Sequence, residues 1–409
     1  MTSIPELPTL QRRALDLVKE VASEKECRPF LVGGPVRDIL LGRAAFDIDL
    51  TLEDGSSTLA RAIAKRLDGR VRSFPQFLTY KVTADGFPEI DIATARKERY
   101  RKPGDLPSVA AGKLKDDLLR RDFSINAIAM DLMSGALHDP ANGERDLSAR
   151  VVRVLHDRSF LDDPTRILRA IRLGRRLGFK PDPHTEKLMA EAIASDSLST
   201  VSRERVWREL FLAFEEESAP EILAELNDRG VLEKFFGARI DANAIARLAA
   251  IQAQVAANPD LDRDVLFTGA LLPTTASAQA QLEGSGFSQK RAKKVLQIAH
   301  DANRFADALG DAKTDRQRFR LFKAASPELL SAVAANRPGE RPHITRFHEF
   351  RNFKLPLRGT DLEVPSGPHI AKALERTREA VFTGEIQPDE ARAFARDIAK
   401  RYLRDNSAT

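Results

Sequence analysis

The hydrophobic periodicity of this chain changes once along its length. Segments with the two-residue alternation of β-strands lie before residue 95, and from about residue 160 onward apolar residues recur at helical spacing. Segregated strands and helices favour an α+β fold and argue against a TIM barrel or a Rossmann chain, in which the two alternate throughout. The 409 residues suffice for roughly two to four domains.

Several segments have the pattern of a particular element. Residues 8–24 are expected to form an amphipathic helix, PFLVGG a strand and tight turn, and PVRDILLG a helix with Pro35 in its first turn. The polar, basic stretch 95–118 is expected to be a functional or mobile loop. Strands are expected at 46–52, 70–74, 77–84 and 88–94, and helices at 202–214, 218–228, 242–256, 287–308 and 388–404. Another helix would carry on one face Ile167, Ala170, Ile171, Gly174 and Gly178.

Composition narrows the class of protein. Lys and Arg number 65 against 60 Asp and Glu, a net charge of +5 that permits an anionic partner without showing one. The single cysteine, Cys27, excludes an internal disulfide framework and a Cys-cluster metal site. No apolar run approaches the ~20 residues that span a bilayer. The start, MTSIPELPTLQRR, has no basic-then-apolar leader, so a soluble cytoplasmic protein with no membrane partner is expected.

Acidic pairs on two predicted strands are candidates for a metal site. Asp47 and Asp49 are two residues apart, so their side chains share one face of a strand, and Glu89 and Asp91 repeat the pattern. If the strands are neighbours, Asp91 completes a three-carboxylate cluster of the kind that holds Mg²⁺ for phosphoryl transfer. The pattern also arises by chance: DLDRD (260–264) has the same spacing but is expected to begin a helix.

Two further motifs could bind a nucleotide. Gly33 and Gly34 precede a predicted helix, where backbone N–H groups and Arg37 could face a triphosphate, although an ordinary strand–turn–helix corner has the same pattern. Asp163 and Arg166 are three apart and would share one helix face. A carboxylate that accepts and a guanidinium that donates complement adenine and cytosine but not guanine or uracil. The alternative is a helix N-cap with a surface ion pair.

Taken together, five segments resemble the tRNA nucleotidyltransferase/poly(A) polymerase family, and in particular its class II CCA-adding branch. They occur in the family's order and cover most of the chain: LVGGPVRDILLGRAAFDIDL (31–50), RRDFSINAIAMD (120–131), DDPTRILRAIRLGRRLGF (162–179), SRERVWREL (202–210) and LPLRGTDLEVPSGPHIAKAL (355–374). The resemblance implies a polymerase beta-like nucleotidyltransferase head (1–150), a helical neck with the nucleotide-template helix (151–215), a helical body (216–310) and a tRNA-binding tail (311–409).

The resemblance also implies a reaction. Metal-bound carboxylates, with Mg²⁺ as cofactor, would activate the tRNA 3′-hydroxyl, which attacks the α-phosphate of CTP or ATP. The implied catalytic carboxylates are Asp47, Asp49 and Asp91, the first two as metal ligands. The implied nucleotide-binding residues are Gly33, Gly34, Arg37, Arg121, Asp122, Asn126, Asp163, Arg166 and Arg169. Asp162 stands where the family usually has Glu, and an exposed ion pair is the alternative for Arg121 and Asp122.

Basic segments are the candidates for contact with tRNA. Residues 96–121 carry nine Lys or Arg and four acids, a local net charge of +5. The candidates are residues 96–119, 289–294 and 337–358, whose phenylalanines could instead be core. In the family, enzymes that add only C have a shortened loop at the place of residues 96–119. In this chain that segment is not obviously shortened. That favours an enzyme that adds CCA or only the terminal A.

Three other functions stay open. They are a CC-adding enzyme, a bacterial poly(A) polymerase and, more distantly, a non-catalytic RNA-binding protein. The segment RVRSFPQFLTYKV (70–82) does not resemble the Arg-rich segment of such polymerases. The intact carboxylates argue against a mere binder, which has no use for a metal cluster.

Overall fold

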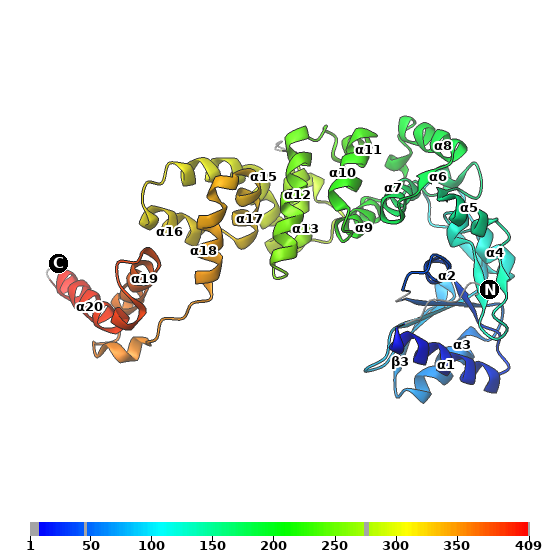
Figure 1. Cartoon of the computed structure of the whole chain (residues 1–409), viewed down its shortest axis with the longest axis horizontal. Helices are drawn as coiled ribbons and strands as arrows, with labels where there is room; N and C mark the ends of the chain where they lie inside the picture. The colour runs from blue at the N-terminus through cyan, green and yellow to red at the C-terminus, as the bar shows by residue number, and fades with distance from the viewer. Residues whose placement is uncertain (1–7, 45–46, 274–277, 408–409) are drawn as a thin grey trace. The chain divides into compact units, whose positions relative to one another are not determined.

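A computed structural model describes residues 8–44, 47–273 and 278–407 of the chain (Figure 1). They form two compact units, the first ending at Gly237 and the second beginning at Ala238. The first contains a mixed sheet and helices, and the second is helical, as an α+β chain requires. This division is coarser than the expected head, neck, body and tail, whose boundaries stay predictions.

The first unit is built on a seven-stranded sheet of order β3-β4-β5-β2-β1-β8-β9. Among its described strand pairs β2 and β5 run parallel and the others antiparallel. The strands expected from the sequence are all present, although Phe46 of the predicted 46–52 strand lies outside the described residues. The bounds are β1 Phe30–Val32, β2 Ile48–Leu52, β3 Arg70–Phe74, β4 Thr79–Thr83, β5 Ile90–Thr94, β8 Ala129–Asp131 and β9 Leu137–His138.

Alternation along the central strands separates core from site. Ile48 and Leu50 of β2 and Ile92 of β5 are buried, so the acidic side chains between them face the opposite way. Helix α3 (Ser56–Arg66) packs against β3, β4 and β5, and α1 (Thr9–Glu24) packs on α3 (Figure 1). Buried apolar surface therefore holds the strands that carry the carboxylates.

The stretch 95–118 is not the loop that the sequence suggested. It forms an antiparallel pair, β6 (Arg96–Arg99) and β7 (Ser108–Ala111), followed by α4 (Leu114–Leu119). The charged side chains of this pair obscure the alternation typical of a strand, and they are stabilised by hydrogen bonds. Arg96 donates to the carboxylate of Glu98 and to the backbone carbonyl of Phe77. The expectation of an irregular loop was wrong because strand propensity depends on such partners.

The rest of the first unit is mainly helical, and the predicted helices are present. Helix α7 (Arg166–Leu177) buries Ile167, Ala170 and Ile171, whereas Gly178 ends the helix in the left-handed conformation. A two-stranded parallel pair, β10 (Val151–Val152) and β11 (Lys180–Pro181), was not expected there. The helices are α2 Gly34–Leu40, α5 Gly143–Ala149, α6 Ser159–Asp162, α7 Arg166–Leu177, α8 Pro183–Ala194, α9 Arg203–Phe214, α10 Ala219–Asp228 and α11 Val231–Phe236.

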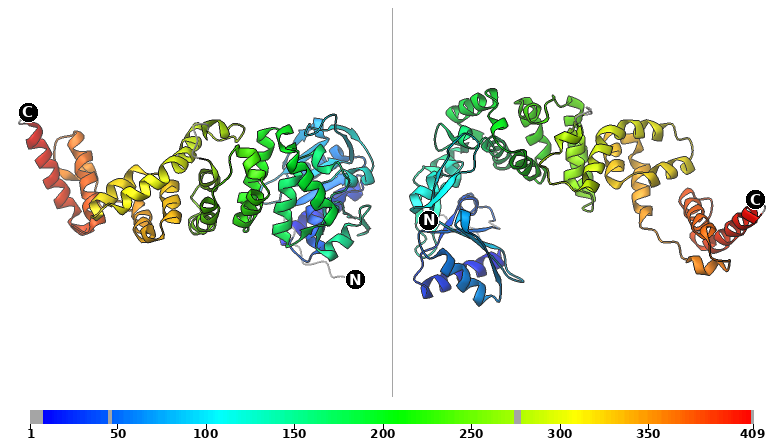
Figure 2. Two further views of the ribbon diagram at one scale, coloured as in Figure 1. Left: turned by 90° about the horizontal axis from the view of Figure 1, so that it is seen from above. Right: turned by 180° about the vertical axis from the view of Figure 1, so that it is seen from behind.

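The second unit confirms the expected helices. Asp262 in DLDRD caps a helix by accepting from the N–H of Val265, as predicted for that acidic cluster. Both views in Figure 2 show α19 (Pro368–Thr383) and α20 (Ala391–Ser407) packed side by side near the C-terminus. The helices are α12 Ala242–Ala257, α13 Arg263–Leu271, α14 Ala278–Gln281, α15 Gln289–Gly310, α16 Asp315–Ala324, α17 Pro327–Asn336, α18 Arg341–Arg351, α19 Pro368–Thr383 and α20 Ala391–Ser407. Among the described helices of either unit, none combines the length and apolarity needed to cross a bilayer.

Candidate active site

Adjacent strands bring the predicted carboxylates to one place. β2 and β5 are parallel neighbours, and Asp49 lies in register with Asp91. Asp47 is exposed and directly precedes β2. On the other side of β5, Lys81 of β4 is in register with Asp91, and its Nζ lies 3.5 Å from Oδ2 of that residue. The neighbouring strands that the sequence analysis required are therefore present.

The electrostatics of these carboxylates favour a bound cation. Burial, together with repulsion from Asp91 and Asp47, raises the pKa of Asp49 to about 6. Burial also raises the pKa of Asp91, against the opposing charge of Lys81. The three-carboxylate cluster expected for neighbouring strands is not formed: within the described residues, no three His, Cys, Asp or Glu side chains converge tightly enough to enclose a metal ion. Asp47 and Asp49 still fit Mg²⁺, which commonly binds one or two carboxylates together with waters and substrate phosphates.

The turn after β1 requires glycine. Gly33 has φ +76°, and a Cβ there would lie 2.7 Å from Nη1 of Arg121. Arg121 is held by Asp117, with 3.0 Å between its Nη2 and Oδ2 of that residue. The Arg121–Asp122 ion pair offered as an alternative is not formed, because each residue has another partner. The glycine thus lets the backbone approach a guanidinium at the point where α2 begins.

A buried polar chain runs from α2 to α7. Arg37 is 5% exposed and donates to Asp38 and, over 2.7 Å, to Oδ1 of Asn126. Nδ2 of Asn126 donates to Oδ1 of Asp122, and Arg169 donates to Oδ2 of Asp122 from Nε and Nη2 at 2.9 and 2.5 Å. Burial alone would raise the pKa of Asp122, but the charge of Arg169 and the donors around it hold that pKa well below its usual range. Asp122 is therefore a carboxylate and accepts hydrogen bonds only.

Asp163 and Arg166 lie at a helix start, not together on a helix face. Asp163 has extended backbone after α6, and Arg166 is the first residue of α7. Oδ1 of Asp163 accepts from the N–H and hydroxyl of Thr165 and lies 2.8 Å from Nη2 of Arg205. The buried Arg166 donates to Oγ of Ser159 and to the carbonyl of Arg120. The predicted same-face geometry was wrong because α7 begins later than the spacing suggested.

One cavity of about 570 Å³ gathers most of the predicted site. Its lining includes Asp49 from the sheet and, from the predicted nucleotide-binding set, Gly33, Gly34, Arg121, Asp122, Asn126, Asp163, Arg166 and Arg169. Asp47 and Arg37 line an adjoining cavity of about 200 Å³ that shares Asp49 and Asp122 with the first. Asp91 lines neither cavity and reaches the site through its strand neighbour Asp49.

The sequence analysis missed several lining residues. Arg205, Arg208 and Glu209 come from α9, inside the motif SRERVWREL from which no individual residue was selected. Their i, i+3, i+4 spacing on a helix was a usable signal. Tyr100 and Glu98 come from the β6 region that was expected to be a loop, and the pKa of Tyr100 is raised to about 12 by burial and by the charge of Glu98.

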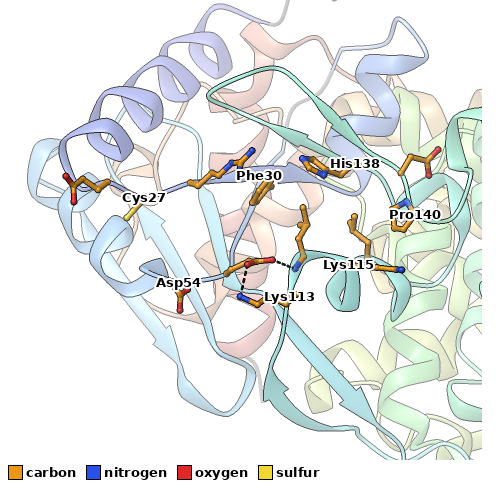
Figure 3. Close-up of a pocket in the computed structure, with 13 residues that line it drawn as sticks. Cys27, Phe30, Asp54, Lys113, Lys115, His138 and Pro140 are labelled. Carbon is orange, nitrogen blue, oxygen red and sulfur yellow. Dashed lines mark hydrogen bonds and ion pairs between the residues drawn. The ribbon is translucent and has the colours of Figure 1, made fainter.

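A separate cavity of the first unit, about 760 Å³, lies elsewhere (Figure 3). Phe30 at the start of β1 and Asp54 beyond the end of β2 line it, so it is at the opposite end of these antiparallel strands from Gly33 and Asp49. Lys113 pairs there with Glu53, which also accepts from the N–H of Leu114. None of the predicted catalytic or nucleotide-binding residues lines it.

In the segments proposed for tRNA contact, some Lys and Arg side chains form ion pairs with acids and others do not. In 96–119 Lys97 and Lys113 pair with acids, and in 289–294 Arg291 and Lys294 do the same. Within the described residues, no ion pair is formed by Arg99, Arg101, Lys102, Lys290 or Lys293. In 337–358 Phe347 is buried in an aromatic cluster that includes Phe319 and Phe382, so this phenylalanine belongs to the core.

Comparison with family models finds two matches. Residues 29–153 match the poly(A) polymerase head domain, and residues 178–238 match a probable RNA- and SrmB-binding site of polymerase A. The head match spans the strands and turns that carry Gly33, Asp49, Asp91 and Asp122.

Curated relatives extend the similarity. An A-adding tRNA nucleotidyltransferase of Aquifex aeolicus is 43% identical over 210 residues, 51% of this chain and 25% of its own length. One of Geobacter sulfurreducens is 30% identical over 92% of this chain and 46% of its own length. A CC-adding tRNA nucleotidyltransferase of the same organism is 28% identical, over 96% of this chain and 95% of its own length. The chain thus spans less than half the length of the first two.

Solved structures share the fold along nearly the whole chain. A CCA-adding enzyme in its apo form II superposes with a TM-score of 0.79 at 25% identity, covering 98% of this chain and 96% of that one. The Thermotoga maritima CCA-adding enzyme complexed with tRNA has a TM-score of 0.74 at 25% identity, with the same coverage. A tRNA-processing enzyme, apo form 2, is 30% identical with a TM-score of 0.70 and covers 82% of this chain and 96% of its own. From the matched head domain, these relatives and the shared fold, we conclude that the chain belongs to the tRNA nucleotidyltransferase/poly(A) polymerase family.

Proposed function

We propose that this protein adds nucleotides to the 3′ end of tRNA from CTP and ATP without a nucleic-acid template, building CCA or its terminal A only. The observation that carries the proposal is the 570 Å³ cavity. Its lining includes Asp49, the turn Gly33–Gly34 with Asp122, and Asp163 with Arg166. Groups suited to a reacting phosphate, a sugar and a base edge thus share one space.

At the phosphate end, Asp47 and Asp49 would hold Mg²⁺. The ion, when bound, would supply positive charge that neutralises the phosphate oxygens and favours ionisation of the 3′-hydroxyl. The backbone at Gly33 and the guanidinium of Arg121 would face the anionic triphosphate. The 3′-oxygen loses its proton to solvent and bonds to the α-phosphorus, and the bond from that phosphorus to the leaving pyrophosphate breaks, with its electron pair leaving on the pyrophosphate oxygen.

At the base end, Asp163 and Arg166 would select the nucleotide. The contacts that hold Asp163 in place fall on Oδ1, which leaves Oδ2 to accept from the exocyclic amine of adenine or cytosine. Arg166 would donate to the adjacent ring nitrogen. Guanine and uracil present a carbonyl and an N–H in the reverse order, and the mismatched groups would be costly in a desolvated site.

Addition of A is supported by the β6–β7 segment. The stretch is ordered as a strand pair, and Tyr100 and Leu106 beside it line the cavity. The resemblance implies a shortened segment here in C-only members of the family, and this one is not obviously shortened. Unpaired cations of this segment, Arg99, Arg101 and Lys102, are candidates for phosphate contacts with tRNA. We expect the reaction to take place in the cytoplasm, where the lone Cys27 would stay reduced.

The test offers the purified protein three tRNAs that end before CCA, after the first C, and after CC. CTP and ATP are supplied separately and together. Addition of A to the third tRNA alone defines an A-adding enzyme, and completion of all three defines a CCA-adding enzyme. Two C additions without A, or a long A tract, would replace the proposal by the CC-adding or polyadenylating alternative, and no extension would overturn it.

A further inference from the structure

A buried glutamate from the helical part of the first unit reaches the nucleotide-binding residues. Glu209 on α9 is 7% exposed and lies between two arginines of α7. Its Oε1 is 3.2 Å from Nη1 of Arg169, and its Oε2 is 3.2 Å from Nη2 of Arg172. Each carboxylate oxygen thus serves one guanidinium, an arrangement that a side chain with a single acceptor oxygen cannot reproduce.

Arg169 joins this glutamate to the predicted sugar site. Nε and Nη2 of Arg169 converge on Oδ2 of Asp122, while its Nη1 points to Glu209. The other oxygen of Asp122 is fixed by Nδ2 of Asn126 and by the N–H of Phe123. Since Oδ2 is held by Arg169 alone among the described side chains, the orientation of this guanidinium sets where the free lone pairs of Asp122 point.

We propose that Glu209 is a positioning residue that, through Arg169, holds Asp122 and Asn126 in the orientation that meets the ribose and so sets the preference for ribonucleotides over deoxyribonucleotides. The inference rests on the proposed function, in which these two residues face the sugar. Glu209 lines the same cavity, and its effect passes through one partly buried ion pair, the one with Arg169.

Glu216 provides a matched comparison within the same network. It follows α9 and contacts Arg172, with 3.2 Å between Oε1 and Nη1, but makes no contact with Arg169 within the described residues. Removing its charge perturbs the same helix pair and one of the same arginines. A loss confined to Glu209 would therefore trace to Arg169 and not to the packing of α7 on α9.

The experiment measures kcat and KM for ATP and for 2′-deoxy-ATP on a tRNA ending in CC, with the wild type, Glu209→Gln and Glu216→Gln. In Glu209→Gln, we expect KM for ATP to rise about tenfold, because one charged hydrogen bond of the network is lost. We expect a smaller change in kcat. The ratio of kcat/KM for ATP to that for 2′-deoxy-ATP should fall by a similar factor. Glu216→Gln should stay within about twofold of the wild type in that ratio.

Two results would overturn the inference. One is an equal loss for both nucleotides in Glu209→Gln, and the other is the same change of ratio in Glu216→Gln. If Glu209→Gln does not fold, Glu209→Asp is assayed instead, because it keeps both carboxylate oxygens on a shorter side chain. The ratio of kcat/KM for ATP to that for 2′-deoxy-ATP should then fall by an intermediate factor. A wild-type protein that extends no tRNA would instead overturn the proposed function, so the two failures are distinguishable.

Discussion

Asp49 on β2 stands directly beside Asp91 on β5, at matching positions of two parallel strands. The strand register fixes this arrangement of the backbone, so both side chains leave the same face of the sheet. Burial and the neighbouring negative charges raise the pKa of Asp49 to about 6. A cation beside Asp49 would relieve that repulsion, and the consequences of the raised pKa can be measured in the protein without substrate.

The first prediction concerns stability. A folded-state pKa above the ordinary value means that Asp49 stabilises the fold below about pH 4 and that this contribution is lost as the pH rises through 6. We expect Asp49→Asn, with no metal added, to raise the free energy of unfolding at pH 7.5 by up to about 3 kcal/mol, and to change it little at pH 4. Denaturant unfolding at both pH values measures this. Asp54→Asn, at an exposed residue beyond the end of β2, is the control and should be neutral at both.

The second prediction concerns metal affinity. Protons and a divalent cation compete for Asp49, so the affinity for Mn²⁺, used as a spectroscopic substitute for Mg²⁺, should fall about tenfold per pH unit below pH 6. Titration of the nucleotide-free protein between pH 5 and 8, followed by electron paramagnetic resonance, gives the affinity. Affinity that is flat across this range, or unchanged in Asp49→Asn, would contradict the assignment.

The third prediction separates backbone strain from crowding at Gly33. A methyl group there would lie 2.7 Å from Arg121, whereas Gly42 has a similar φ of +71° and nothing within 4 Å. Both Gly→Ala variants should lose about 1 kcal/mol of stability from the positive φ. Gly33→Ala should also raise KM for ATP about tenfold by displacing Arg121, and Gly42→Ala should not. Equal KM values for the two variants would argue against a nucleotide at this turn.

The fourth prediction concerns base selection. Arg166→Ala should reduce the preference for ATP over GTP at least tenfold, because the mismatched donor and acceptor at the guanine edge no longer meet a fixed guanidinium. The ratio of incorporation rates is the proper readout, since it does not depend on how much of the protein is folded. Arg158→Ala, which removes an exposed ion pair with Asp162 on the preceding segment, should leave the ratio unchanged.

The sequence alone predicted those parts of the site that depend on local pattern. Alternation in FDIDL placed Asp49 opposite a buried face, and the glycine pair marked the turn before α2. The proximity of Asp91 to Asp49 depends on the pairing of β2 with β5. Residue spacing does not show which strands pair, so the sequence analysis could state this proximity only as a condition. Residues that act through long-range ion pairs were missed: nothing local links Glu209 to Arg169, forty residues earlier, or Arg205 to Asp163. The β6–β7 pair was missed because charged side chains that satisfy one another resemble a solvated loop.

The central claim is that the cavity around Asp49 carries out the addition of nucleotides to tRNA. The most direct test compares wild type with Asp49→Asn in single-turnover extension of end-labelled tRNA that ends in CC, with ATP and Mg²⁺ present. The affinity of both proteins for tRNA is measured in parallel. We expect wild-type protein to add A, and Asp49→Asn to lose incorporation while binding tRNA within about twofold of wild type, since the carboxylate serves the reaction and not the RNA surface. Undiminished extension by Asp49→Asn would contradict the claim.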